Sequence, residues 1–261
     1  MSTLLERARR GEPITDFEII DMHGHLGPCG FLLPDLDPAA LVAGMDRMGV
    51  KTTVVSHMCS LSRDAAQGNR EVLAAMQAFP GRLLGYAAFW PESEEAVRAE
   101  VEWAVTQGFT GFKLHNANGF PYTHPAYAPV YECAQEQRRP VLFHTWGQET
   151  EFAQLADEVA PRYPEMSVLL AHAGSANADA YVAVARTRPN IYLEVCYSAA
   201  PRGMVARLVN KAGAEKVVWG SDASFYSQVQ QFGKVLGADL PEDVLRQVLS
   251  TNAQRILERI V

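Results

Sequence analysis

The sequence predicts an α/β protein, a single (β/α)8 barrel, and three observations support this. Short apolar runs rich in β-branched residues recur about every 25 to 35 residues, roughly the length of one βα unit. Helical periodicity fills the gaps between the runs. The chain has 261 residues, and such a barrel needs about 250. Residues 1–261 are therefore expected to form one barrel domain.

Eight runs are expected to be parallel strands. Several are almost continuously apolar, as is typical of parallel strands buried on both faces. The alternative, an open doubly wound sheet, usually carries a glycine-rich phosphate turn after an early strand, and this sequence has none. The expected strands are FEIIDMH (17–23), VKTTVVS (50–56), RLLGYAAF (82–89), GFTGFKLH (108–115), PVLFHT (140–145), SVLLAH (167–172), NIYLEV (190–195) and KVVWGS (216–221).

Helices are expected between the strands, most plainly over 64–79 and 93–107, where apolar residues follow i, i+3, i+4 spacing. Ser93 is a suitable N-cap because its hydroxyl can accept from a first-turn N–H. Gly49 and Gly108 follow two expected helices, where a left-handed cap residue is common.

The two ends of the chain flank this repeat. Residues 1–16 are expected to be an N-terminal extension, and 241–261 a C-terminal helix that starts at Pro241. The first residues contain no apolar run after their charges, and no later apolar stretch is long enough to span a bilayer. The four cysteines form no CxxC pair, which favours free thiols in a reducing compartment, so we expect a cytoplasmic protein.

The charge balance excludes some partners. The formal net charge of -7 leaves no basic surplus to neutralise phosphates, which argues against nucleic acid and anionic membranes as partners. A small anionic substrate is still compatible, because a bound divalent cation would dominate the local field. The expected partner is a small molecule, with a second copy of the chain as a candidate for closing the site.

Histidines cluster at the strand ends, where a barrel of this kind carries its chemistry. Only His124 lies in a loop away from any expected strand. The six that lie at or just after strand ends are His23, His25, His57, His115, His144 and His172.

The pair His23 and His25 has a geometric interpretation. Side chains two apart on a strand point the same way, so both imidazoles can reach one ion, and Gly24 leaves the backbone room. His144 and His172 end the fifth and sixth strands, and Asp222 follows the last one. Taken alone, Asp222 is a common turn or N-cap residue. Together with the histidines it predicts a site for zinc, manganese or ferrous iron.

At this point the chain resembles a known group. The motifs IIDMHGHL, GFKLH, VLFHT, LLAHAG, VVWGSDA and TNAQRIL are similar to the amidohydrolase superfamily, and most similar to its amidohydrolase-related branch of hydrolases and decarboxylases. The resemblance runs from about residue 17 to 258. It implies that His23, His25, His144 and Asp222 bind the metal. It also implies that His172 is a ligand of a second metal or an acid/base beside the first.

Lys113 has two interpretations. Binuclear members of the superfamily carry a carbamylated lysine on the fourth strand that bridges two metals, and the segment FKLH resembles that motif. A lysine desolvated inside a barrel has a depressed pKa, and its neutral amine reacts with carbon dioxide. The alternative, which we favour, is an unmodified ammonium that binds a substrate carboxylate.

Other residues are candidates for substrate contacts. His115 is expected either to contact substrate or to cap its strand end. His57 is expected to line the pocket or to be a hydrogen-bonded core residue. Trp146, Phe225 and Tyr226 follow the metal-ligand candidates and are candidates for an aromatic wall, although aromatic residues near barrel loops are more often packing.

These interpretations predict a metal-dependent hydrolase that acts on an ester, lactone or amide of a small organic acid. A metal lowers the pKa of its bound water from 15.7 to about 7. Asp222 then serves as a proton carrier and His172 as a stabiliser of the developing oxyanion. Zinc is the metal we expect first, with manganese or ferrous iron as alternatives. The competing hypotheses are a decarboxylase of an aromatic or unsaturated acid on the same scaffold and a barrel used only for binding.

Overall fold

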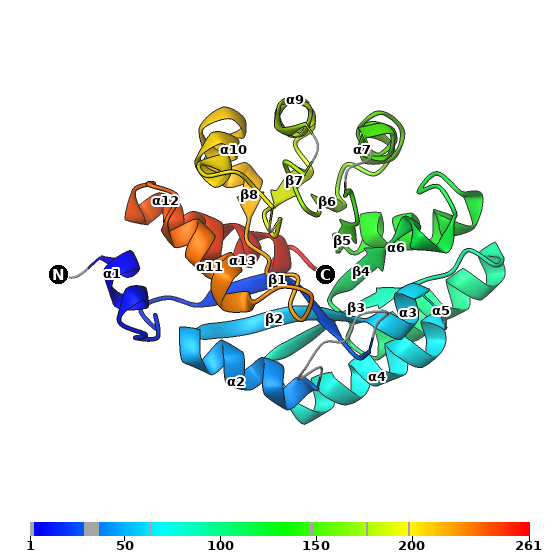
Figure 1. Ribbon diagram of the computed structural model, residues 1–261. Coiled ribbons are helices and arrows are strands. Elements are labelled where there is room, and N and C mark those ends of the chain that lie inside the picture. Colours follow the sequence, from blue (N-terminus) through cyan, green and yellow to red (C-terminus); the bar gives the residue numbers. More distant parts are fainter. Residues whose placement is uncertain (1–2, 29–36, 63, 147–148, 176, 198) are drawn as a thin grey trace.

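The computed structural model of the chain describes residues 3–28, 37–62, 64–146, 149–175, 177–197 and 199–261. All eight expected strands are present, and they form one parallel sheet in sequential order (Figure 1). The predicted (β/α)8 barrel is therefore confirmed. The strands are β1 (Ile19–Leu26), β2 (Val50–His57), β3 (Leu83–Ala88), β4 (Gly111–Leu114), β5 (Pro140–Phe143), β6 (Ser167–Leu170), β7 (Ile191–Glu194) and β8 (Val217–Val218).

Helices surround this sheet, and Figure 1 shows them as an outer ring. Ser93 caps its helix as expected, since its hydroxyl accepts from Ala96 N–H, and Gly49 adopts the left-handed C-cap conformation with φ 82°. The helices are α1 (Leu4–Arg9), α2 (Pro38–Met48), α3 (Met58–Ser62), α4 (Ala65–Ala78), α5 (Glu94–Thr106), α6 (Ala128–Glu136), α7 (Glu149–Gln154), α8 (Ala160–Arg162), α9 (Ala178–Thr187), α10 (Met204–Ala212), α11 (Gln228–Leu236), α12 (Glu242–Arg246) and α13 (Asn252–Leu257).

The C-terminal helix begins after Pro241 as predicted, but a π-helical turn over Gln247–Thr251 separates α12 from α13. Within that turn the carbonyl of Val248 accepts from Trp219 N–H, just after β8. The wider turn thus connects the last helix to the end of the last strand.

The barrel closes between β1 and the segment after β8. Met22 N–H donates to Trp219 O at 3.1 Å, and Asp222 N–H donates to His23 O at 2.7 Å. The buried carboxylate of Asp21 accepts from the backbone and hydroxyl of Ser221 and from the side-chain amide of Gln228. These contacts join residues about 200 positions apart in the chain.

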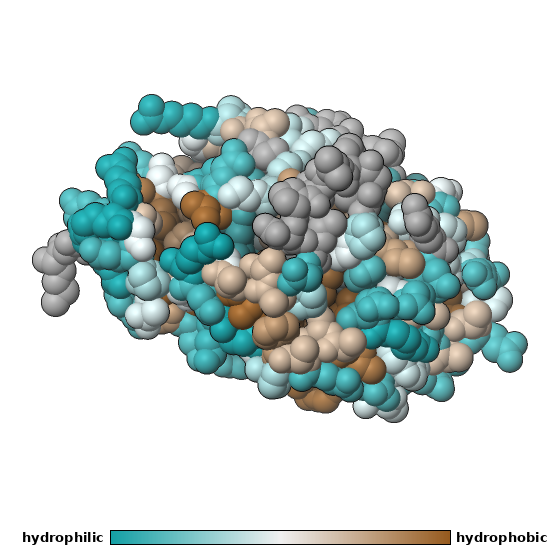
Figure 2. All heavy atoms as spheres, turned by 60° about the horizontal axis from the view of Figure 1, so that its bottom comes forward, coloured by the Kyte–Doolittle hydropathy of each residue, from teal (hydrophilic) through white to brown (hydrophobic). Residues whose placement is uncertain are grey.

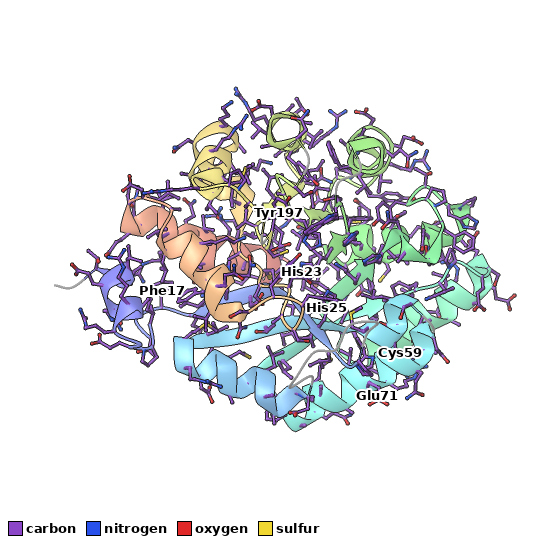
Figure 3. All side chains as sticks on the ribbon, in the orientation of Figure 1. Phe17, His23, His25, Cys59, Glu71 and Tyr197 are labelled. Carbon is purple, nitrogen blue, oxygen red and sulfur yellow. The ribbon has the colours of Figure 1, made fainter. Side chains whose placement is uncertain are left out.

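A one-residue bulge in β1 changes which side chains face the barrel axis. Asp21 pairs with Thr53 and Gly24 with Val55, so β1 advances three residues while β2 advances two. Such a bulge reverses the alternation of side chains beyond it. Before it, Ile20 and Met22 belong to the small core inside the barrel; beyond it, the two histidines of the HxH pair lie at the centre of the ring (Figure 3).

Two apolar cores support the site. The larger one lies between the sheet and the surrounding helices. The smaller one fills the barrel, with Leu142, Leu169 and Val218 from the strands, and includes Ala253 and Ile256 of α13. The mouth is thereby built on packed strands, which is how this fold keeps catalytic groups rigid.

The face of the molecule in Figure 2 is a mosaic of hydrophilic residues and small hydrophobic patches. Among the described residues, the exposed large hydrophobic side chains are Phe120, Trp146, Val229 and Val261. Within the described ranges, no helix is long and apolar enough to cross a membrane.

Candidate metal centre

Three donor atoms meet at the C-terminal mouth of the barrel. His23 Nε2 lies 3.1 Å from His25 Nε2, and Asp222 Oδ1 lies 3.4 Å from the first nitrogen and 3.0 Å from the second. All three side chains are buried. The residues come from β1 and from the turn after β8, so the closure of the barrel brings them together.

This triad fits a divalent cation. Metal–nitrogen and metal–oxygen bonds of about 2.0–2.1 Å place neighbouring ligand atoms about 3.0–3.4 Å apart. The three separations fall within that range. Two imidazoles and one carboxylate are also a donor set that zinc, manganese and ferrous iron accept.

Both triad histidines are oriented by a second hydrogen bond. His23 Nδ1 lies 3.0 Å from Glu194 Oε2, and His25 Nδ1 lies 3.0 Å from Ser56 Oγ. With Nδ1 engaged, each ring presents Nε2 to the triad. Such partners fix the tautomer and ring orientation of metal-binding histidines.

Glu194 is completely buried at the end of β7, and burial raises the pKa of its carboxyl to about 8. Its Oε1 has no hydrogen-bond partner among the described residues. Gly220 makes room for it, because a Cβ there would lie 2.3 Å from Oε1 and 2.6 Å from His23 Cβ. The glycine in the motif VVWGSDA is therefore required by packing against the centre.

Burial keeps the histidines neutral, which is the form that binds a cation. It lowers the pKa of His23 and His144 well below the usual value and that of His172 to about 3. Burial also lowers the pKa of His25, although the Asp222 carboxylate beside it opposes this shift.

Two residues of the centre adopt the left-handed backbone conformation, which residues other than glycine rarely take. The φ of His172 is 58° and that of Asp222 is 54°. Strained conformations of this kind persist where the surrounding structure holds them, and they concentrate at functional sites. At Asp222 the hydrogen bond to His23 O holds the turn, so the carboxylate points at the two triad histidines.

A second group of donors lies behind the first. Among the described residues, His23, His172 and Cys196 also bring nitrogen and sulfur atoms within 4.8 Å of one another, and all three are buried. His144 belongs to neither group. Its Nδ1 lies 3.1 Å from His172 Nε2, and its ring stacks on that of His115 with centroids 3.9 Å apart.

Lys113 is completely buried, with Nζ 3.1 Å from His23 Nε2. Burial lowers the pKa of its amine to about 8. The lysine therefore lies against the triad, within reach of any ion held there. Its roles as a bridging ligand or a substrate contact stay predictions.

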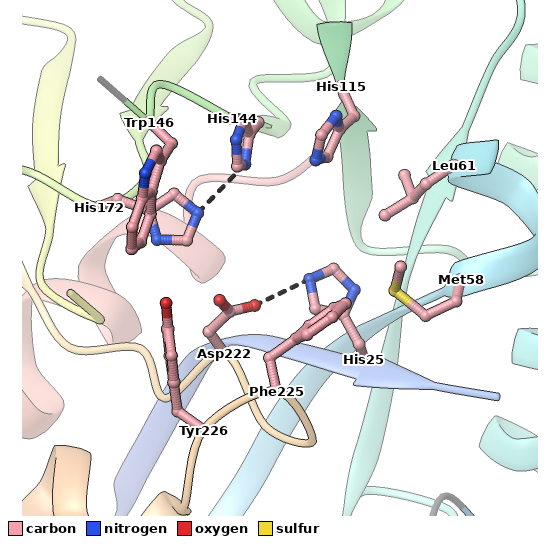
Figure 4. Close-up of a pocket in the computed structure, with 10 residues that line it drawn as sticks. All are labelled: His25, Met58, Leu61, His115, His144, Trp146, His172, Asp222, Phe225 and Tyr226. Atoms are coloured by element: carbon pink, nitrogen blue, oxygen red, sulfur yellow. Dashed lines mark hydrogen bonds and ion pairs between the residues drawn. The ribbon is translucent and has the colours of Figure 1, made fainter. Parts of the chain in front are cut away.

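A cavity of about 430 Å³ opens above the triad. Figure 4 shows Trp146 and Tyr226 on one side, Met58 and Leu61 on the other, and Asp222 and His25 between them. Trp146, Phe225 and Tyr226, the candidates for an aromatic wall, all line this cavity, and their contact with a substrate stays a prediction. The other described lining residues are His115, His144, His172 and Phe225.

The chain matches the sequence model of the family described as Amidohydrolase over residues 20–259. The chain belongs to the amidohydrolase family. This membership agrees with the resemblance in the motifs, identifies the chain as a member of a family of enzymes and supports a divalent cation as its cofactor. No curated protein matches the chain.

Solved structures share the fold of this family. The chain is similar to 5-carboxyvanillate decarboxylase from Sphingomonas paucimobilis, at 17% identity and a TM-score of 0.73 over 94% of this chain and 100% of the other. It is similar to dihydroxybenzoic acid decarboxylase from Polaromonas, at 18% and 0.74 over 93% and 97%. It is also similar to 4-oxalomesaconate hydratase from Rhodopseudomonas palustris, at 19% and 0.71 over 92% and 96%.

The two remaining predicted site residues of this family member, His115 and His57, differ in their relation to the cavity. His115 lines it and also caps the next turn, since its Nδ1 accepts from Ala117 N–H, so both expectations have a structural basis. His57 is half-buried, accepts from Cys59 N–H and is not among the residues that line the cavity. Of the four cysteines, Cys59, Cys133 and Cys196 are free thiols, and Cys29 lies outside the described residues.

Sequence reasoning missed the groups that orient the triad. The sequence predicts no role for Ser56 or Cys196, and for Glu194, at the end of the seventh expected strand, it predicts only a hydrogen bond that supports the pocket. One signal was available: each lies at or just past a strand end, on the face where the barrel carries its chemistry. Serine and cysteine are too common at such positions to stand out without the histidines that they contact.

Proposed function

We propose that the chain is a metal-dependent decarboxylase of a small aromatic or unsaturated carboxylic acid. One observation carries this proposal. The cavity that opens above the triad has a lining whose surface is mostly apolar. A carboxylate moved from water into such surroundings is destabilised relative to a transition state that spreads its charge.

The charge of the centre suits an acid. Two neutral imidazoles, one carboxylate and a divalent cation sum to one net positive charge, and the ammonium form of Lys113 lies directly against them. When bound, the cation orients an oxygen of the substrate and stabilises negative charge that develops beside it. Trp146 and Tyr226 on one side and Leu61 on the other orient a planar ring and exclude water from it.

Asp222 is the residue to which we assign proton delivery, because it is the carboxylate among the described lining residues. The bond between the ring carbon and the carboxylate breaks, its electron pair stays on the carbon, and carbon dioxide leaves. The Asp222 carboxylate takes one proton from solvent and passes it to that carbon, so Asp222 is again ionised at the end of the turnover. The structural neighbours that are decarboxylases with bound manganese support this choice and favour manganese over zinc.

Hydrolysis of an ester, lactone or amide is the second candidate. The observation in its favour is the position of Asp222 against both triad histidines, where a carboxylate can take a proton from a water molecule. The same residues serve both reactions, so the products must distinguish them.

The test is an assay of the metal-free chain reloaded with manganese or zinc against a panel of hydroxybenzoic and unsaturated acids. We expect carbon dioxide release and, in heavy water, one deuterium on the carbon that lost the carboxylate. His25→Ala should abolish turnover, whereas His124→Asn, at the N-cap of a 3-10 helix and not among the residues that line the cavity, should not. Product that carries oxygen from labelled water, with no carbon dioxide, would establish hydrolysis instead.

A further inference from the structure

Cys196 lies two residues after Glu194, completely buried behind the triad. Its sulfur touches side chains that come from three strand ends. Sγ lies 2.9 Å from Glu194 Oε2, 3.0 Å from His172 Nδ1 and 3.3 Å from His23 Nδ1. No other described side chain bonds to all three.

The hydrogens available to this cluster limit how it can be arranged. Glu194 Oε2 faces the backbone N–H of His172, a fixed donor, and so acts as an acceptor. His23 Nδ1–H donates to the same oxygen, because its Nε2 faces the triad. The thiol carries one hydrogen, and the carboxyl oxygen at 2.9 Å is its strongest acceptor.

We propose that Cys196 is a positioning residue that sets the tautomers of His172 and His144. With the thiol hydrogen directed at Glu194, the sulfur accepts from Nδ1–H of His172. The Nε2 lone pair of His172 then accepts from Nδ1–H of His144. His144, which lines the cavity, is left with a lone pair on its own Nε2. This inference rests on the proposed function of the same site.

The chain of contacts explains how a buried thiol acts on the cavity. Without the sulfur, His172 Nδ1 loses its acceptor, and the ring gains by placing its hydrogen on Nε2, facing His144. That hydrogen drives the one on His144 to Nε2. His144 would then present an N–H to the cavity, which can neither bind a cation nor take a proton.

The first experiment reads the tautomers directly. Long-range proton–nitrogen NMR spectra of the zinc-loaded, ¹⁵N-labelled protein distinguish a ring with hydrogen on Nδ1 from one with hydrogen on Nε2. We expect Nδ1–H on both His172 and His144 in the unmodified chain. The opposite pattern on His172 would overturn the proposal without any variant.

The second experiment uses three variants and measures metal affinity by competition with a chromophoric chelator. If His144 is the further ligand that the family resemblance implies, Cys196→Ala should lower the affinity by ~10- to 100-fold. Cys196→Ser keeps a donor and an acceptor and should stay close to the unmodified value. Cys133→Ala removes a half-buried thiol from α6, away from the centre, and should have no effect.

Three outcomes would contradict the positioning role. The first is unchanged affinity and unchanged tautomers in Cys196→Ala. The second is a Cys196→Ser variant that melts like the unmodified chain yet binds metal as weakly as Cys196→Ala. The third is an intense near-ultraviolet thiolate band on cobalt loading, which would make Cys196 a ligand. These readouts need no substrate, so they remain decisive if the chain proves to be a hydrolase.

Discussion

The hydroxyl of Ser56 illustrates how single residues outside the triad control the centre. It is buried on β2, and it engages the nitrogen of His25 that faces away from the triad. Ser56→Ala should lower metal affinity by ~10-fold, because the ring loses the partner that fixes its orientation. Competition with a chromophoric chelator measures the change.

Ser167 offers a matched control. It is equally buried on β6, but its hydroxyl has no hydrogen-bond partner among the described residues. Ser167→Ala should leave metal affinity unchanged. If both variants lost affinity equally, a general packing effect would replace the orienting role of Ser56.

The glycine before the Ser-Asp turn allows a second prediction at this scale. Gly220→Ala forces a methyl group against Glu194 and His23, which should lower the free energy of unfolding by about 1–3 kcal/mol and weaken metal binding. Gly233→Ala, in α11, has open space and should be neutral or stabilising by up to about 1 kcal/mol. Urea denaturation of both variants tests the pair, and equal destabilisation would contradict it.

At the scale of elements, the contact between β1 and the turn after β8 depends on Asp21. Its carboxylate accepts hydrogen bonds from Ser221 and Gln228 and has no exposed surface. Asp21→Asn places an amide where donors converge, so we expect a loss of about 2–4 kcal/mol in the free energy of unfolding. A double-mutant cycle with Ser221→Ala should show coupling between the two residues, and additive losses would rule the contact out as the cause.

The elements were largely predictable, because a buried parallel strand requires a dense apolar run and nothing else in the chain has that composition. The last strand shows where the pattern fails. The run 216–221 reads as one strand, yet β8 ends at Val218, since Trp219 N–H already donates to the C-terminal helical segment. Such bonds depend on residues far along the chain, which periodicity does not report.

The site was predictable in part for a related reason. Ligand-type residues at strand ends identified His23, His25 and Asp222, whose donor atoms the fold brings together. The bulge that turns the two histidines toward the axis leaves no mark in the sequence beyond Gly24. The contacts of Cys196 arise from three strands and are visible only once those strands are side by side.

At the scale of the whole molecule, six buried or half-buried histidines with lowered pKa values predict acid sensitivity. Their neutral forms are favoured in the folded state, so the unfolded chain binds more protons and stability is lost as the pH falls below about 6.5. Asp21 and Glu194, with pKa values raised to about 6 and about 8, act in the opposite direction but are fewer. The urea midpoint of the metal-free protein should therefore fall from pH 7 to pH 5. A midpoint that stays constant or rises would contradict the prediction that the histidines outweigh the two carboxyl groups.

Metal removal is the second whole-molecule prediction. A cation that binds only the folded chain stabilises it by about 2.7 kcal/mol at one hundred times its dissociation constant. Chelation should therefore lower the melting temperature, and manganese should restore it. The His25→Ala variant should show no such response, which separates binding at the triad from adventitious binding elsewhere.

The seam between β1 and the turn after β8 also determines when the centre can exist during synthesis. His25 leaves the ribosome early, but its carboxylate neighbour Asp222 emerges almost two hundred residues later. A growing polypeptide therefore cannot assemble the cation site, however much of the wall of strands has already formed. Metal capture at the triad must be among the last events of maturation, and a chain truncated before the final turn would lack one of the three donors.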